Sequence, residues 1–462
     1  MVAAVGCERR RKDLSWQEDL SLTPAIQPLA PPIERTQFVP VGTTQQSSVS
    51  EPWIGAFVTG ISGWTLDAFD FFLVVLSLTA IGQDFGQSVP HMALTAWATL
   101  AMRPVGAFLF GGISDRYGRR IPMVVNLCLF AVVELATGFT RSFATFLVLR
   151  GLFGIVMGGQ WGVGVSLAME KVPTRYRGML SGLLQQGYAI GFLFAAAAYY
   201  IIAPAHGWRP LFYLGSLPAL GLALFVWLRV RESEAWLKNH QTTFGGLGRA
   251  VAAHWKLLLY FTVFMMAMNM SSHGTQDLYP TFLEKDWGIA GKQRALLSAM
   301  SMAGAILGGL SIGWISDRIG RRRSMIGAIT GALLVIPLWA FAHTLTMLVL
   351  GAVLIQFCVQ GAWGVVPAHV AELSPDSVRG TLPGLGNQIG VLIAGGLPFL
   401  EASTARSSSY ATAMAAWAAG VFCLAAVMTL VGREQKGRSF SGSQEFSSGI
   451  ASAGKMDEAH QV

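Results

Sequence analysis

A short stretch of the chain recurs almost unchanged in its second half. Residues 112–120 read GISDRYGRR, and residues 313–322 read GWISDRIGRR. Asp115 and Asp317 are 202 positions apart. The same separation pairs Trp161 with Trp363, Glu170 with Glu372, Pro173 with Pro375, Arg177 with Arg379, and Gly178 with Gly380. A repeat that stays in register over this length predicts two halves with the same topology.

The composition is that of a membrane protein. The chain has 462 residues, of which 53% are hydrophobic and only 13% are charged, and its mean hydropathy is +0.50. Soluble domains carry about 25% charged residues, so a water-soluble enzyme, a disordered protein and a nucleic-acid-binding protein are excluded. The four cysteines are too scattered for a disulfide framework or a metal site. We therefore expect no metal and no cofactor.

Twelve apolar segments are long enough to cross a bilayer. Their predicted extents are 54–81, 91–113, 121–139, 143–168, 179–203, 209–229, 257–283, 294–313, 324–342, 345–368, 381–400 and 410–432. They form an N-terminal half at 53–229 and a C-terminal half at 257–432, joined by a polar central loop at 230–256. Tails at 1–52 and 433–462 complete the prediction, and we expect the second to be disordered from Gly437. No apolar segment follows the basic run near the N-terminus. Residues 1–52 are therefore interpreted as a tail and not as a signal peptide.

Basic residues are distributed unequally between the two sets of loops. The loops on the side of the N-terminus, with the segment after the last span, hold 19 Lys and Arg residues, and the opposite loops hold six. The positive-inside rule therefore predicts that both termini are cytoplasmic. This describes a multi-pass protein of the plasma membrane, or of the inner membrane in a bacterium. We expect it to be a monomer embedded in the lipid bilayer.

Two further motifs accompany the doubled loop. They are Arg150-x-x-x-Gly154-x-x-x-Gly158-Gly159 and an E-x-x-P-x-x-x-R-G pattern that begins at Glu170 and again at Glu372. Over nearly all of residues 53–432 the chain resembles the major facilitator superfamily. The resemblance implies an all-α fold of twelve transmembrane helices in two six-helix halves, related by an axis along the membrane normal. It also implies secondary transport by alternating access.

Two segments resemble a narrower branch of that superfamily. Residues 66–71, LDAFDF, are similar to the sialate and monocarboxylate proton symporters. Residues 269–281, NMSSHGTQDLYPT, meet every fixed position of the N-x-x-[ST]-H-x-[ST]-Q-D-x-x-x-T signature of Jen-type lactate/monocarboxylate–proton symporters. The resemblance implies electroneutral uptake of a short monocarboxylate with a proton, lactate or pyruvate first.

The seventh segment carries a polar stripe. Asn269, His273 and Asp277 recur every four residues and so share one helix face, which Gln276 adjoins. Such a stripe should face a cavity, because charges that face lipid are costly. Since histidine changes charge near physiological pH, we expect His273 and Asp277 to carry the proton, and Asn269, His273 and Gln276 to bind substrate. The alternative is a His–Asp hydrogen bond that only rigidifies the helix. Pro280 should break the helix near its outer end.

Charged residues also lie near the middle of the first two segments. Arg103 is predicted to bind the substrate carboxylate through two parallel hydrogen bonds, with Asp67 or Asp70 as its resting partner. Either aspartate is also a candidate proton carrier. The alternative is a permanent structural pair between Arg103 and one of them. Glu134 and Arg150 are predicted to form a separate structural pair.

Amides occupy matching depths in the fifth and eleventh segments. Gln185 and Gln186 correspond in the repeat to Asn387 and Gln388. We expect Gln186 and Asn387 to bind substrate, and Asn387 resembles the specificity position of the Jen group. The alternative for these amides is hydrogen bonding between helices.

The repeated loops favour a gate on the cytoplasmic side. Asp115 is predicted to cap the helix that begins near Gly380, and Asp317 the helix that begins near Gly178. Glu170 and Glu372 should pair with nearby arginines, and these contacts must break during alternating access. The alternative is a solvated basic loop. The predicted gating residues are Asp115, Arg116, Arg119, Glu170, Arg177, Asp317, Arg318, Arg321, Glu372 and Arg379.

Other functions stay open at this stage. The protein could be a symporter for sialic acid or another organic anion, a proton-driven drug exporter, or a nutrient sensor that transports nothing. Enzymatic activity is not expected, because the sequence shows no nucleophile–base set, metal-ligand cluster or phosphate loop.

Overall fold

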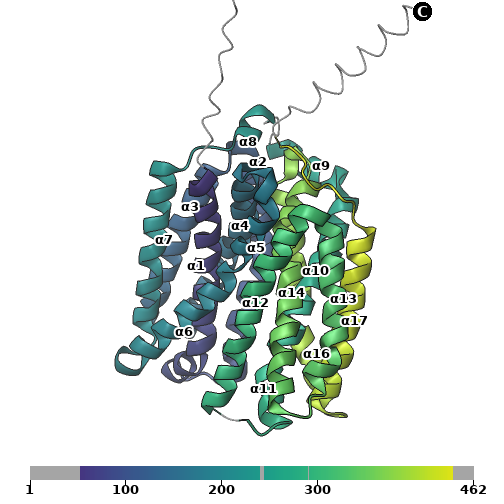
Figure 1. Ribbon diagram of the computed structural model, residues 1–462. Coiled ribbons are helices and arrows are strands. Elements are labelled where there is room, and N and C mark those ends of the chain that lie inside the picture. Colours follow the sequence, from purple (N-terminus) through teal and green to yellow (C-terminus); the bar gives the residue numbers. More distant parts are fainter. Residues whose placement is uncertain (1–52, 240–243, 290, 441–462) are drawn as a thin grey trace, which may run out of the picture. The chain divides into compact units, whose positions relative to one another are not determined.

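The computed structural model describes residues 53–239, 244–289 and 291–440. Every regular element in these ranges is a helix (Figure 1). The predicted N-terminal tail at 1–52 and residues 441–462 of the predicted C-terminal tail at 433–462 lie outside the described residues.

The helices reproduce the twelve predicted segments. The N-terminal half contains α1 (Trp53–Asp84), α2 (Val89–Tyr117), α3 (Arg120–Gly138), α4 (Phe143–Lys171), α5 (Arg177–Gln185), α6 (Gly187–His206) and α7 (Arg209–Arg229). The central loop contains α8 (Glu234–Asn239) and α9 (Phe244–Ala253). The C-terminal half contains α10 (Trp255–Gln276), α11 (Tyr279–Lys285), α12 (Gly291–Ile319), α13 (Arg321–Ala340), α14 (Leu345–Leu373), α15 (Thr381–Ala394), α16 (Leu397–Ala405) and α17 (Tyr410–Val431). The all-α fold with two six-segment halves is confirmed.

Within the described ranges, ten helical stretches are long and apolar enough to span a membrane, and one of them, Thr174–His206, includes both α5 and α6. An eleventh candidate is the pair Gly246–Ala253 and Trp255–Lys285, whose two parts meet at 70°. The predicted segment 381–400 is divided into α15 and α16 at Gly395 and Gly396, and neither piece is long enough alone. Large apolar side chains such as Tyr200 and Leu334 are exposed on the helices, as expected where a bilayer is the solvent.

Three of the twelve segments are broken. α5 and α6 meet at Gln186, α10 and α11 are separated by Asp277 and Leu278, and α15 and α16 are separated by two glycines. Pro280 lies in the first turn of α11, a position that tolerates its missing N–H. The predicted break at the outer end of the seventh segment is therefore confirmed, and it falls just before the proline.

The two halves meet closely through glycines, and α5 packs against α12. A Cβ atom added to Gly182 would lie 2.1 Å from the carbonyl oxygen of Gly309. One added to Gly178 would lie 2.6 Å from the carbonyl oxygen of Gly313. Small residues at a helix interface let two backbones approach within van der Waals distance. The equivalent pair in the repeat, α2 and α15, also packs together.

Candidate functional site

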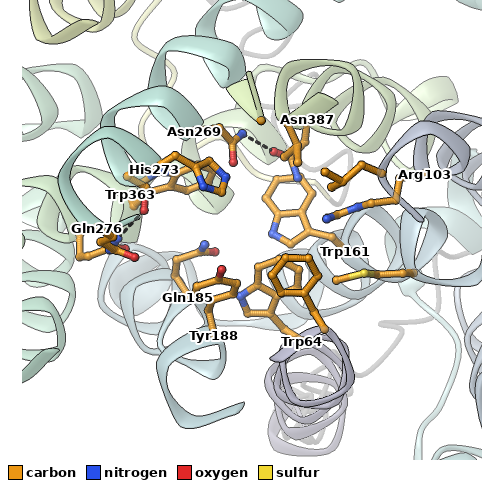
Figure 2. Close-up of a pocket in the computed structure, with 17 residues that line it drawn as sticks. Trp64, Arg103, Trp161, Gln185, Tyr188, Asn269, His273, Gln276, Trp363 and Asn387 are labelled. Atoms are coloured by element: carbon orange, nitrogen blue, oxygen red, sulfur yellow. Dashed lines mark hydrogen bonds between the residues drawn. The ribbon is translucent and has the colours of Figure 1, made fainter. Parts of the chain in front are cut away.

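A cavity lies between the two halves and has a volume of about 100 Å³. Figure 2 shows Arg103 entering it from one side and His273 from the other. Residues from α1, α2, α4, α5 and α6 line one wall, and residues from α10, α14 and α15 line the opposite wall. Among the described residues that line it there is one arginine and one histidine, and no Asp or Glu.

Arg103 is held in α2 with 5% of its surface exposed. Its backbone is fixed by the neighbouring helix, since a Cβ on Gly158 would lie 1.9 Å from the Arg103 carbonyl oxygen. The described part of the chain contains no ion pair between Arg103 and Asp67 or Asp70. The predicted resting pair is therefore absent, and the guanidinium borders the cavity.

Asp70 pairs with a different arginine. Arg150 Nη1 donates to Asp70 Oδ2 and Oδ1 at 2.9 and 3.1 Å, and Arg150 Nη2 donates to Thr137 Oγ1 at 2.9 Å. Glu134 lies 3.6 Å from Arg150 Nη2, so the predicted Glu134–Arg150 pair is present but has Asp70 as a third member. Asp67 and Asp70 were the two predicted alternatives for the partner of Arg103, and the Asp70 alternative was wrong, because its side chain meets α4 and not α2.

Asp67 is fully buried, and neither of its carboxylate oxygens has a hydrogen-bond partner. It lies outside the residues that line the cavity. Arg103 is near enough to act on it electrostatically without an ion pair. A buried carboxyl without a partner is stable only when it is neutral.

The polar stripe of the seventh segment has two parts. Three of its residues line the cavity, and Asp277 contacts one of them from outside the lining. Asn269, His273 and Gln276 line the cavity. Asn269 Nδ2 donates to Asn387 Oδ1 at 3.1 Å (Figure 2). Asp277 lies behind His273, with Asp277 Oδ2 2.9 Å from His273 Nδ1. This contact leaves Nε2 as the ring nitrogen available to a ligand.

Gln185, not Gln186, lines the cavity. Gln186 Nε2 instead donates to the Gly182 carbonyl oxygen at 3.3 Å and packs against Gly309 of α12. Consecutive residues of a helix point about 100° apart, so only one of the pair can face the cavity. Asn387 is at the cavity as predicted.

Sequence reasoning missed the aromatic walls. Trp64, Trp161, Tyr188 and Trp363 all line the cavity, and Trp64 stacks on Tyr188 with 5.8 Å between ring centroids. The pairing of Trp161 with Trp363 across the repeat was the available signal, because it places two tryptophans at equivalent depths. Gln360, whose Nε2 donates to Ser272 Oγ at 2.8 Å, was also missed.

The first predicted helix cap is present. It lies at the end of the helices that carries the repeated loops 112–120 and 313–322, which we call the loop end. Asp115 Oδ1 accepts from Gly380 N at 2.8 Å, and Asp115 Oδ2 accepts from Thr381 N at 3.0 Å. Arg119 joins Asp115 at 2.7 Å to Glu170 at 3.0 Å. Burial alone would lower the pKa of Arg119, but Glu170 and Asp115 outweigh it and raise the pKa above its usual range.

The second predicted cap repeats the first. Asp317 Oδ1 accepts from Gly178 N at 2.7 Å, and Asp317 Oδ2 accepts from Met179 N at 2.9 Å. Arg321 joins Asp317 at 2.7 Å to Glu372 at 3.0 Å. Both capping contacts are confirmed, and each ties a helix of one half to a helix of the other.

Two more ion pairs cross between the segments of this network. Arg177 lies 3.2 Å from Glu372, and Arg379 lies 3.5 Å from Glu170. Burial lowers the pKa of Arg379, and Glu170 opposes that effect. The predicted pairing of Glu170 and Glu372 with arginines is confirmed.

The other two predicted gating residues, Arg116 and Arg318, contact aromatic rings. The Arg116 guanidinium lies 5.0 Å from the ring centroid of Tyr117, and that of Arg318 lies 3.4 Å from the ring centroid of Trp314. Each arginine thus covers an aromatic ring of its own helix.

The repeat extends to two glutamates that sequence reasoning missed. Glu232 accepts from the backbone N–H groups of Arg119 and Arg120, at 2.7 and 3.1 Å. Glu434 accepts from those of Arg321 and Arg322, at 3.2 and 2.9 Å. A carboxylate at a helix N-terminus is stabilised there. Glu232 and Glu434 are also 202 positions apart, which was the signal available.

Residues 434–440, which we name the C-terminal clamp, complete the network. The Phe440 ring lies 4.2 Å from the Arg177 guanidinium and 4.1 Å from that of Arg379. Gly437 N donates to Glu372 Oε1 at 3.3 Å. The expectation of disorder from Gly437 was wrong for residues 437–440, because these contacts fix them.

Comparison with known proteins gives a consistent assignment. Residues 53–277 match the Major Facilitator Superfamily model, and residues 249–432 match the Sugar (and other) transporter model. The chain is 28% identical over 425 residues to a carboxylic acid transporter protein homolog of Saccharomyces cerevisiae, which covers 83% of this chain and 69% of that protein. It is 25% identical over 407 residues to the sialic acid transporter NanX of Escherichia coli, covering 86% and 98%.

A solved structure supports the same fold. The structure of the proton:xylose symporter XylE bound to 6-bromo-6-deoxy-D-glucose superposes with a TM-score of 0.68 at 17% identity, covering 84% of this chain and 98% of that one. Together the two family models span residues 53–432, the whole of the doubled helical architecture. The chain therefore belongs to the major facilitator superfamily, and its relatives include transporters of organic acids.

Proposed function

We propose that this protein is a proton-coupled symporter that takes up short monocarboxylates, lactate and pyruvate first, by alternating access. One observation carries the proposal. The cavity presents a guanidinium that has no carboxylate partner, opposite a histidine, and no described Asp or Glu lines it. Such a site attracts a small anion.

Arg103 is the proposed ligand of the substrate carboxylate. A guanidinium donates two parallel hydrogen bonds to a carboxylate, a geometry that an ammonium cannot reproduce. Across the cavity, Asn269, Asn387 and Gln276 offer amides that can bind the hydroxyl or keto group of the substrate. Gln186 is not part of this proposal, and Gln185 takes its place.

The size of the cavity favours a short substrate. Its volume of about 100 Å³ is below the ~300–1,000 Å³ typical of pockets for drug-sized ligands. Lactate and pyruvate suit this space better than sialic acid or a drug. The similarity to a sialic acid transporter nonetheless makes other organic anions the second candidate.

The proposed proton carriers are His273 and Asp277, with Asp67 as a further candidate. A proton on His273 adds a positive charge beside the cavity at the moment the anion enters, so the loaded site gains no net charge. Asp70 is a weaker candidate than before, because Arg150 already neutralises it. The gate residues at the loop end, predicted to be cytoplasmic, close that side of the cavity and must separate for release.

The test is transport by purified protein in liposomes. Radiolabelled lactate should accumulate when the external pH is lowered, and a protonophore should abolish the accumulation. Lactate accumulation that persists without a proton gradient would overturn symport. Competition with pyruvate, sialic acid and longer organic acids separates the proposed substrate from the second candidate. A drug exporter would instead exchange protons for substrates that lack a carboxylate.

A further inference from the structure

Glu401 of α16 is an ionisable residue to which neither the fold nor the proposed site assigns a role. It is fully buried, and neither of its carboxylate oxygens has a hydrogen-bond partner. No described Lys, Arg or His forms an ion pair with it. It lies outside the lining of the cavity.

The side chain lies against the backbone of α10, beside the predicted proton carriers. A Cβ added to Gly274 would lie 2.9 Å from Glu401 Oε1. Gly274 directly follows His273 and precedes Asp277 by three residues, close to one helical turn. The Asp277 carboxylate is near enough to repel a negative charge on Glu401.

The other surroundings supply no compensating charge. α16 packs against α10 and α17. Along α17 the titratable residues are Tyr410 and Cys423, and neither is basic. On α16 itself the next charged residue is Arg406, at the C-terminal cap. The charged group that acts on Glu401 is therefore Asp277.

A carboxylate in such a place cannot keep its charge. Burying an ionised carboxylate without a partner costs so much free energy that the group takes up a proton instead. Two neighbouring carboxyl groups also resist being ionised together. Since Asp277 contacts His273, the proton belongs on Glu401.

We propose that Glu401 is a proton-binding residue of the transport cycle that works with the His273–Asp277 pair. In this conformation the proton is bound to a carboxylate oxygen of Glu401. When α16 separates from α10, at the break formed by Gly395 and Gly396, water reaches the carboxyl group. The O–H bond then breaks, the proton passes to water, and the carboxylate is left charged. The inference rests on the proton coupling proposed above.

The first experiment measures the proton directly and needs no transport. Infrared spectra of the purified protein in lipid report the C=O stretch of protonated carboxylic acids. Glu401→Gln should remove one such band, and the matched surface control Glu284→Gln should remove none. Glu284 is half-exposed and pairs with Arg294, so it differs from Glu401 in both exposure and partner. An unchanged protonated-carboxyl signal in Glu401→Gln would overturn the proposal, even if lactate proves not to be the substrate.

The second experiment asks whether this proton is used. In liposomes, Glu401→Gln should lower gradient-driven accumulation about tenfold relative to counterflow exchange in the same variant, because glutamine cannot release a proton. Equal loss of both activities in folded protein would make Glu401 structural, and wild-type behaviour in both would make it a bystander. If the glutamine variant does not fold, Glu401→Asp replaces it. The aspartate should keep the protonated-carboxyl band and the coupling, and loss of either in folded protein would overturn the proposal.

Discussion

The two halves of the molecule agree at one end and differ in the middle. At the loop end, Arg119 and Arg321 make the same contacts, 2.7 Å to an aspartate and 3.0 Å to a glutamate in each case. At the depth of the cavity the repeat keeps Trp161 and Trp363 but not the charged and titratable residues. The position equivalent to Arg103 is Ala305, and the position equivalent to His273 is Phe71.

The difference separates what alternating access needs from what the substrate needs. The two equivalent caps, for which we propose a gating role, tie both halves together in the same way. The site that we propose for a small anion has no such symmetry. The N-terminal half supplies Arg103 to the cavity, and the C-terminal half supplies His273. The divergent positions are therefore the ones to examine for specificity and coupling.

The largest expected effect comes from the fixed cation. Arg103→Lys keeps the charge but loses the two-pronged geometry, and we expect kcat/KM for lactate uptake to fall at least about 100-fold, or about 2.7 kcal/mol. Initial rates at several lactate concentrations measure this, with Arg209→Lys as the control, since Arg209 is partly exposed and lies outside the cavity lining. Wild-type affinity in Arg103→Lys would contradict carboxylate binding by this residue.

The titratable residue gives the next effect. His273→Ala should reduce proton-driven accumulation by about 30-fold relative to counterflow exchange of preloaded lactate, which needs no net proton movement. The matched variant at the equivalent position of the other half, Phe71→Ala, should keep the pH dependence of uptake. If accumulation and counterflow fall together in folded His273→Ala, the residue binds substrate and does not couple transport to protons.

The caps test the symmetric part of the comparison. Asp115→Asn and Asp317→Asn each weaken charge-assisted bonds to two backbone N–H groups, which contribute about 1.5–3 kcal/mol apiece. Each should speed the labelling of a cysteine placed at Leu100 in the cavity, from the predicted cytoplasmic side, by about tenfold. Rates that differ greatly between the two variants would show that one cap dominates the gate.

The smallest effect concerns the support of His273. Asp277→Asn removes the negative charge that favours a protonated imidazole, so His273 loses its proton more easily. The pH of half-maximal lactate uptake should therefore move downward, by about one unit. An unchanged pH profile would support a purely rigidifying His–Asp contact.

The fold and the two helix caps could be predicted because their signals are local or repeated. Length and hydropathy define a membrane segment, and an aspartate kept at the same offset in both halves points to the helix start it caps. The stripe from Asn269 to Asp277 was predictable for the same reason, since helical spacing alone puts it on one face.

The other features of the site depend on how each helix is rotated about its own axis and on which helices it packs against. The spacing of residues along the sequence specifies neither. The spacing of Asp67 and Asp70 did not reveal that Asp70 meets Arg150 of α4. Gln185 and Gln186 differ by one step of helical rotation, beside a break that no periodicity shows. Glu401 was missed because it follows the predicted segment 381–400, where the broken helix still runs through packed protein.

The C-terminal clamp decides where a reporter can be attached. Because Glu434, Gly437 and Phe440 hold residues of both halves, a fluorescent protein joined directly after Gly432 would replace these contacts with a linker. Such a fusion would report on a loosened transporter and overstate how often it opens. A fusion joined after Phe440 keeps the clamp in its own sequence, so comparing the two fusions in one uptake assay separates the behaviour of the protein from that of its label.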